Sequence, residues 1–312
     1  MRTLVTGASG AIGSELVPAL TRSGHRVVSF GRSAKRIRAA GVEGPIVEGD
    51  VLSGEGLKDA LQGVDVAYYL VHSMEASETN ESFAERDRRA AEQFASEAAT
   101  AGVERIIYLG GPDTSAATSS GALSPHLASR LEVEQALIAA VPGSVAFRAS
   151  IVIGARSRSF RFLVRLLERL PVMPLPSWRE FRTRPIDQRD VTSFLLQAAV
   201  TPGVSGRSID IAGPDEITLA EVMETIADEM LIDRPRLDIN LAGRSLAAAS
   251  VAAAVSGEDV GLIAPLLSSL SSDILPRDLG AADEFDVRLH SFRSAVSNAL
   301  RGLEQLEPVG AR

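Results

Sequence analysis

A glycine-rich turn stands at the start of the chain, between a short apolar run and a helical pattern. The run Thr3-Leu4-Val5 leads into Thr6-Gly7-Ala8-Ser9-Gly10-Ala11-Ile12-Gly13, and a helix is expected over residues 11–23. A turn of this kind brings backbone N–H groups and the positive end of the helix dipole to one point, which suits a pyrophosphate. The sequence therefore predicts an N-terminal βα unit that binds a dinucleotide.

Each glycine of the turn has its own expected role. Gly7 permits the tight turn, Gly10 lets a phosphate approach the backbone, and Gly13 lets the helix pack closely on the strand. The alternative is a plain glycine-rich turn without a ligand, but the strand before it and the helix after it favour a binding site. The predicted cofactor-binding residues here are Gly7, Ser9, Gly10, Ala11, Ile12 and Gly13.

Short β-rich runs alternate with helical patterns through the first half of the chain. Strands are expected at residues 3–6, 26–30, 46–48, 66–71, 105–109, 145–149 and 208–211. Helices are expected at residues 11–23, 56–61, 81–101, 125–140, 159–170 and 191–200, the last with Asp190 as its N-cap. This alternation predicts an α/β fold, a Rossmann-type doubly wound parallel sheet. Residues 1–152, completed by 186–212, should form the nucleotide-binding core, and residues 153–185 and 213–312 a smaller, mostly helical lobe on the substrate side.

Composition argues against several other classes of protein. The net charge of −8 argues against a nucleic-acid partner, and the lack of cysteine excludes thiol catalysis and cysteine-bound metal. The four histidines have no metal-ligand spacing, so no metal is expected. The most apolar later stretch, 246–255, is shorter than the ~20 residues of a membrane span. With no signal-peptide pattern, we expect a cytoplasmic protein that acts on a small molecule.

The residues after the second strand favour NADP(H) over NAD(H). An NAD site usually places an acidic residue there, to hold the ribose 2′-hydroxyl. This strand ends in Gly31-Arg32, and no acidic residue occurs between Glu15 and Glu43. Arg32 and Arg36 are suited by charge and by donor geometry to a 2′-phosphate. The alternative, a solvated helix face, fits Arg38 better than Arg32.

A second nucleotide contact is expected where the third strand ends, at Gly49-Asp50-Val51. The Asp50 carboxylate is suited to accept a hydrogen bond from the adenine amino group, with Val51 beside the ring. Asp50 is equally suited to cap the short turn that follows.

With these residues in place, the chain resembles the short-chain dehydrogenase/reductase superfamily over about residues 1–215. The matching pieces are residues 6–13, 49–51, 64–71, 103–111, 184–191 and 211–214. Within it, the chain is most similar to the atypical, NmrA-like and complex-I-subunit-like group, through residues 69–74, 83–89 and 123–130. The resemblance implies that Leu70, Val71 and His72 line the cofactor site. It also aligns Asp87 with a position where relatives often carry Asn, although a surface salt bridge explains Asp87 as well.

The chain departs from the superfamily at its catalytic motif. Relatives typically use a Tyr four residues before a Lys, with a Ser upstream, and the Lys lowers the pKa of the Tyr. The only lysines here are Lys35 and Lys58, and glycine stands four residues before each. By resemblance, His126 takes the Tyr position and Arg130 the Lys position, one helical turn apart, while Gly110 and Gly111 fall near the Ser position.

Two functions follow from this departure. In the first, His126 donates a proton and Arg130 anchors the nicotinamide ribose, so that the protein reduces a small carbonyl, quinone or enone. In the second, hydride chemistry is lost and the protein is a non-catalytic NADP(H)-binding regulator, such as a redox sensor, or an assembly factor. A third interpretation makes His126 a surface residue at the start of a helix.

The substrate side is expected at residues 151–162 and 171–184. Arg156, Arg158 and Arg161 are suited to attract an anionic substrate, and Trp178 and Phe181 to stack on a planar one. Solvated arginines and core aromatic residues are the plainer alternative.

Overall fold

Seven parallel strands form the central sheet of the computed structural model, which describes residues 1–72, 82–114, 123–176, 179–239, 253–255, 257 and 272–307. Their order across the sheet is β11-β6-β5-β4-β1-β2-β3. The strands are β1 (Arg2–Thr6), β2 (Arg26–Gly31), β3 (Ile46–Glu48), β4 (Val66–Tyr69), β5 (Arg105–Gly110), β6 (Val145–Ala149) and β11 (Arg207–Ile211). Every pairing is parallel, so the predicted doubly wound fold is confirmed.

Helices cover both faces of the sheet, and successive strand residues point to opposite faces. Leu4 packs into the core beneath α3 (Leu57–Leu61), α4 (Phe83–Thr100) and α5 (Pro125–Ala140), whereas Val5 packs beneath α1 (Gly13–Arg22) and α7 (Gln188–Ala198). Strands that are buried on both faces in this way are continuously apolar. The carboxyl ends of the strands therefore meet along one edge that neither helix layer covers.

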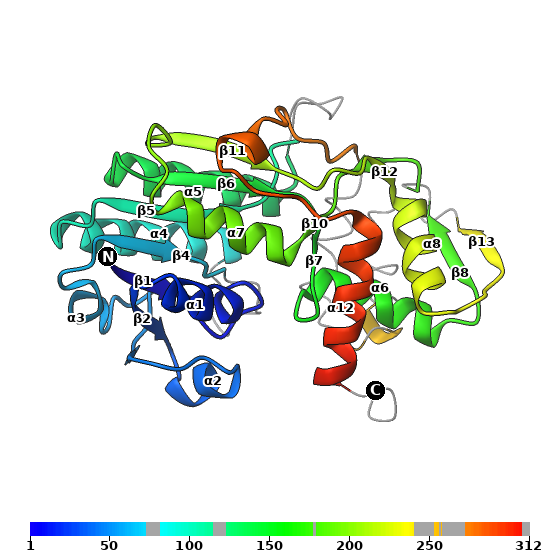
Figure 1. Cartoon of the computed structure of the whole chain (residues 1–312), viewed down its shortest axis with the longest axis horizontal. Helices are drawn as coiled ribbons and strands as arrows, with labels where there is room; N and C mark the ends of the chain where they lie inside the picture. The colour runs from blue at the N-terminus through cyan, green and yellow to red at the C-terminus, as the bar shows by residue number, and fades with distance from the viewer. Residues whose placement is uncertain are drawn as a thin grey trace.

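A second core lies in the carboxy-terminal lobe, beside the sheet in Figure 1. It packs together α6 (Arg158–Arg169), α8 (Leu219–Glu229) and α12 (Phe292–Leu306). The shorter elements of this half are β7 (Val152–Ile153), β8 (Met173–Pro176), β9 (Arg182–Thr183), β10 (Ile186–Asp187), β12 (Ile217–Thr218), β13 (Arg236–Ile239) and α11 (Ala281–Glu284). Residues 281–287, which precede α12, pack on the core of the sheet, and the predicted division into core and lobe stays a prediction.

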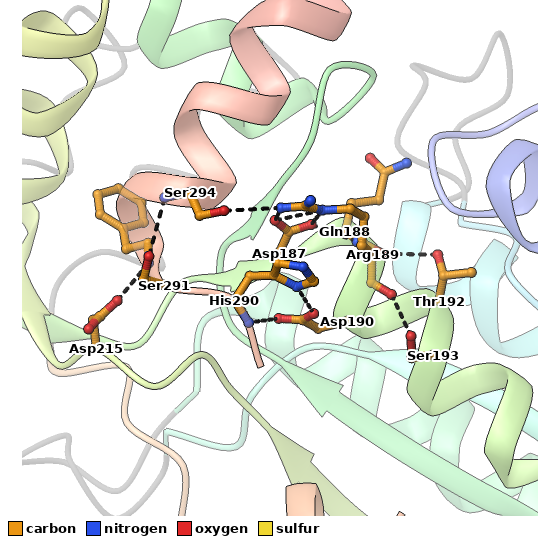
Figure 2. Close-up of polar contacts among 11 residues, drawn as sticks. Asp187, Gln188, Arg189, Asp190, Thr192, Ser193, Asp215, His290, Ser291 and Ser294 are labelled. Carbon is orange, nitrogen blue, oxygen red and sulfur yellow. Dashed lines mark hydrogen bonds and ion pairs between the residues drawn. The ribbon is translucent and has the colours of Figure 1, made fainter. Parts of the chain in front are cut away.

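Two local predictions differ from the structure. The N-cap of α7 is Asp187 rather than Asp190, because the Asp187 carboxylate accepts the Arg189 N–H at 2.7 Å (Figure 2). Asp190 lies in the first turn of the helix instead, and accepts hydrogen bonds from His290. The six-residue helix α2 (Ala34–Ala39) was not predicted, because its single buried side chain, Ile37, leaves no periodic pattern.

Phe285, in the segment before α12, packs against the core of the central sheet, and this contact yields a stability prediction. Its ring centroid lies 5.2 Å from that of Phe147 and 5.8 Å from that of Phe194, and the side chain is 2% exposed. We expect Phe285→Ala to lower the free energy of unfolding by about 3–5 kcal/mol, because it leaves a cavity in a packed core. Chemical denaturation measures the change. Leu279→Ala, at a 55% exposed position, is the control and should change it by less than about 0.5 kcal/mol. Equal effects of the two substitutions would contradict this account.

Candidate functional site

One cavity of about 860 Å³ lies along the carboxyl ends of the strands and contains every residue predicted for the site. Its volume is that of a typical cofactor or ligand pocket. The walls come from the glycine turn, the ends of β2 to β6, the start of α5 and the start of α6. The predicted residues on the walls are Gly7, Ser9, Gly10, Ala11, Ile12, Gly13, Arg32, Arg36, Asp50, Val51, Leu70, Val71, His72, His126 and Arg130.

The glycine turn packs so tightly that two of its positions have no room for a side chain. Gly7 has φ +67°, and a Cβ there would lie 2.5 Å from the Leu70 carbonyl oxygen. A Cβ on Gly13 would lie 2.4 Å from the Gly7 carbonyl oxygen. Within the described residues, the N–H groups of Ala11 and Ile12 donate to no protein acceptor. Two backbone donors on the cavity wall are thus available for a ligand.

Gln188, which no sequence pattern indicated, supports this turn from the start of α7. Its Nε2 donates a hydrogen bond to the Ala11 carbonyl at 3.0 Å, across 177 residues of sequence. The side chain is 8% exposed, and a Cβ on Gly154 would lie 1.9 Å from its Oε1. No local pattern marks such a residue, because its role arises only when the two segments meet.

The cavity end next to β2 is basic. Arg32 and Arg36 line it, and the Ser33 side chain between them accepts the Arg36 N–H as the N-cap of α2. Glu48 approaches from β3, but its Oε1 accepts the Ala34 N–H at 2.6 Å, and the residue does not line the cavity. Arginine thus lines the cavity where an NAD site usually carries an acid.

Asp50 takes the second of its two predicted roles and remains on the cavity wall. Its Oδ1 accepts the Leu52 N–H at 2.8 Å, which closes the turn after β3. Asp50 and the buried Val51 both line the cavity. Turn closure uses one carboxylate oxygen, so Oδ2 is left for a ligand.

A cluster of two histidines and one arginine lies at the other end of the cavity. His126 and Arg130 are one turn apart on α5, and the Nη1 of Arg130 donates a hydrogen bond to the Nε2 of His72, which follows β4. The Tyr108 hydroxyl donates to the Arg130 carbonyl at 3.3 Å. Since a guanidinium can only donate, Nε2 of His72 is the acceptor and the ring proton is on Nδ1, where the Leu109 backbone accepts it.

Burial and the Arg130 charge keep both histidines neutral at pH 7. Burial, and secondly Arg130, lower the pKa of His126 to about 4. The pKa of His72 is also well below its ordinary value, for the same two reasons and because His126 is close. His126 is therefore a neutral imidazole beside a permanent cation, and the imidazolium form is scarce at physiological pH.

The three tyrosines do not reach the cavity. Tyr68, Tyr69 and Tyr108 are buried in the core, and none lines the cavity wall. Burial raises the pKa of Tyr108 to about 12, and also raises those of Tyr68 and Tyr69. Gly110 and Gly111, which the resemblance aligns near the serine of the superfamily motif, line the wall. A tyrosine is therefore not available as the proton donor.

The expected substrate residues divide into two groups. Arg156 and Arg158 line the cavity, but Arg161 was wrongly grouped with them, because its Nη2 pairs with Glu307 at 2.7 Å. Phe181 packs against the core of the lobe, which is the plainer alternative. Trp178, Ser73, Met74 and most of the loop between residues 110 and 124 lie outside the described residues.

Asp87 is buried on α4 and does not line the cavity, whereas Arg86 and Arg89 on the same helix do. Burial is the main cause of the raised pKa of Tyr69, and the charge of Asp87 adds to it. Among the described residues, no three His, Asp or Glu side chains are grouped to hold a metal ion. None of the described helices combines the length and apolar character of a membrane span.

Comparison with known proteins agrees with this geometry. Residues 7–139 match the family model described as NAD(P)H-binding. By this match, residues 7–139 are an NAD(P)H-binding domain. The match and the relatives below agree with the predicted resemblance, and the narrower NmrA-like assignment stays a prediction.

The relatives that extend over most of the chain are named as reductases. Ceramide reductase from Caulobacter vibrioides is 29% identical over 234 residues, 75% of this chain and 71% of that protein. The 2-alkyl-3-oxoalkanoate reductase of Stenotrophomonas maltophilia is 24% identical over 76% of this chain and 78% of its own length. The chain shares its fold with the solved UDP-glucuronic acid 4-epimerase of Bacillus cereus in complex with NAD, at a TM-score of 0.76. The sequence identity is 17%, and the match covers 98% of this chain and 99% of that chain.

The lowered pKa of His126 predicts a pH dependence of stability. The unfolded chain binds a proton at His126 below about pH 6.5, whereas the folded protein binds it only below about pH 4. Stability that is fully present above pH 6.5 is therefore lost as the pH falls toward 4, by about 3 kcal/mol in all. We expect His126→Gln to show a shallower loss than the wild type when urea denaturation is followed from pH 7 to pH 4. Parallel curves for the two proteins would show that the imidazole is not held neutral.

Proposed function

We propose that this protein is an NADP(H)-dependent oxidoreductase that transfers hydride to a small carbonyl, quinone or enone without a Tyr-Lys pair. The observation that supports this most directly is that His126, Arg130 and the glycine turn line one cavity. The names of the relatives add to it, since ceramide reductase and 2-alkyl-3-oxoalkanoate reductase both name reductions. The cysteine-free composition suits a reducing cytoplasm, where we place the protein.

The residues of the cavity fit a dinucleotide in an extended arrangement. The Ala11 and Ile12 N–H groups and the start of α1 would hold the pyrophosphate. Arg32 and Arg36 would hold the 2′-phosphate, and the Asp50–Val51 segment would hold the adenine. At the far end, His72 fixes the Arg130 guanidinium, which would position the nicotinamide ribose. When bound, NADPH supplies the hydride.

His126 would act on the substrate oxygen as a neutral hydrogen-bond donor. Its pKa of about 4 means that few molecules carry an imidazolium at pH 7. A neutral imidazole N–H still polarises a carbonyl and stabilises the negative charge that develops on oxygen as hydride reaches the carbon. The oxygen then takes its proton from water through the imidazole. Arg130 adds positive charge beside His126, which favours the same anionic oxygen.

A second candidate is a non-catalytic NADP(H)-binding regulator or assembly factor. It is favoured by the lack of a tyrosine hydroxyl on the cavity wall and by the low pKa of His126. In this function the same turn and arginines bind the cofactor, and the protein senses its redox state without transferring hydride.

One assay separates the two functions. The full-length protein is saturated with NADPH, binding is confirmed by fluorescence, and aldehydes, enones and quinones are screened for loss of the nicotinamide absorbance. We expect turnover that falls about 100-fold or more in His126→Ala, which removes the donor. The control His25→Ala changes a histidine outside the cavity and should retain the rate. Tight binding of NADPH with no turnover of any compound would instead support the regulator.

The basic end of the cavity predicts the cofactor preference. We expect the ratio of NADH to NADPH dissociation constants to fall about tenfold or more in Arg32→Ala and in Arg36→Ala, because each loses a charge-assisted bond to the 2′-phosphate. Fluorescence titration with each cofactor measures the ratio. Arg38→Ala is the matched control, because Arg38 is an exposed residue of α2 that does not line the cavity. A preference for NADPH that survives both substitutions would contradict the assignment of the 2′-phosphate to these arginines.

A further inference from the structure

We propose that Arg156 and Arg158 form an oxyanion-recognition site for the substrate, so that the carbonyl compound reduced here carries a carboxylate or another anionic oxygen group. The proposal rests on the proposed hydride-transfer function and names the substrate class of that site. Both arginines line the lobe end of the cavity, at the start of α6.

The cavity is strongly basic in a protein that is acidic overall. The chain has a net charge of −8, yet the only carboxylate residue on the described cavity wall is Asp50. The cationic residues on the same wall are Arg32, Arg36, Arg86, Arg89, Arg130, Arg156 and Arg158. Walls of one charge sign concentrate ligands of the opposite sign, so the cavity as a whole selects anions. An anionic cofactor accounts for part of this charge, and the question is what the rest binds.

Pairing along α6 singles out the two arginines at its start. Arg161 and Arg165 both pair with Glu307, and the Nη1 of Arg169 donates to the Val255 carbonyl at 2.8 Å. Arg156 and Arg158, by contrast, make neither a hydrogen bond nor an ion pair with any described residue. Arg156 is also half-buried, so its guanidinium has lost part of its hydration without gaining a protein partner. A ligand with anionic oxygens would satisfy both groups.

The other parts of the bound cofactor already have partners elsewhere in the cavity. Arg32 and Arg36 lie after β2, at the end assigned to the 2′-phosphate, and the Ala11 and Ile12 N–H groups are assigned to the pyrophosphate. Arg130 is held by His72. Arg156 and Arg158 come from the lobe, next to Ser150, Ile151 and Val152, which also line the cavity. This position assigns them to the second ligand, the substrate.

The test compares 4-carboxybenzaldehyde with benzaldehyde, two aldehydes that differ by one carboxylate, using the full-length protein saturated with NADPH. We expect the wild type to have a kcat/KM at least about tenfold higher for the charged aldehyde. In the double variant Arg156→Gln/Arg158→Gln this advantage should disappear, while kcat/KM for benzaldehyde and the dissociation constant for NADPH stay within about twofold. Arg22→Gln, an exposed arginine of α1 outside the cavity, is the control and should keep the advantage.

Several results would overturn the proposal. Equal kcat/KM for the two aldehydes in the wild type would do so, and so would a double variant that loses NADPH affinity instead, because the arginines would then serve the cofactor. If neither aldehyde is reduced, the failure belongs to the proposed function. Calorimetric titration of the NADPH-loaded protein with benzoate and benzamide then decides the present inference. Binding of benzoate alone, lost in the double variant, supports it, and equal behaviour of the two compounds overturns it.

Discussion

The rest of the site depends on the close packing of the glycine turn against the backbone of Leu70 and against the start of α1. The Leu70 carbonyl after β4 approaches Gly7, and the Gly7 carbonyl approaches Gly13 at the start of α1, each leaving no space for a Cβ. This packing fixes where α1 begins and holds the Ala11 and Ile12 N–H groups on the cavity wall. Because Leu70 directly follows β4, the strand next to β1, the same contact sets the turn against His72 two residues later. The backbone contact between Gly7 and Leu70 thus fixes the glycine turn relative to His72, at the other end of the cavity.

The permanent cation Arg130 changes what its two histidine neighbours can do. A guanidinium is a cation at physiological pH, so Arg130 places a positive charge beside His72 and His126. Together with burial, this charge holds both imidazoles neutral. Neutral His72 can then accept a hydrogen bond from Arg130, which an imidazolium could not. The site therefore holds a fixed cation beside a neutral imidazole, an arrangement that suits reactions in which charge stabilisation matters more than rapid proton release.

Most of the sheet was predictable because its signals are local. The strands at residues 46–48 and 145–149 and the helix at 125–140 have the predicted bounds, since β-rich runs and helical patterns are read within a few residues. Predictions failed where a partner lies far away in the sequence. Arg161 was assigned to the substrate because nothing near it reveals Glu307, 146 residues later. At α7, both Asp187 and Asp190 are good N-cap residues, and only the contact of Asp190 with His290 separates them.

The start of α7 connects the cofactor turn to the lobe, as Figure 2 shows for the contacts with α12. The Nε2 of Gln188 donates a hydrogen bond to the Ala11 carbonyl. The buried Asp190 accepts one hydrogen bond from the backbone N–H of His290 at 2.9 Å and another from its Nδ1 at 2.5 Å. Further along, Asp215 accepts the Phe292 N–H at 2.6 Å, at the first residue of α12. Since α12 and α6 share one packed core, these bonds fix the position of α6, and of the arginines at its start, relative to the glycine turn. The hydride transfer that we propose would require reacting groups held to within fractions of an ångström, and rigid contacts of this kind supply that precision.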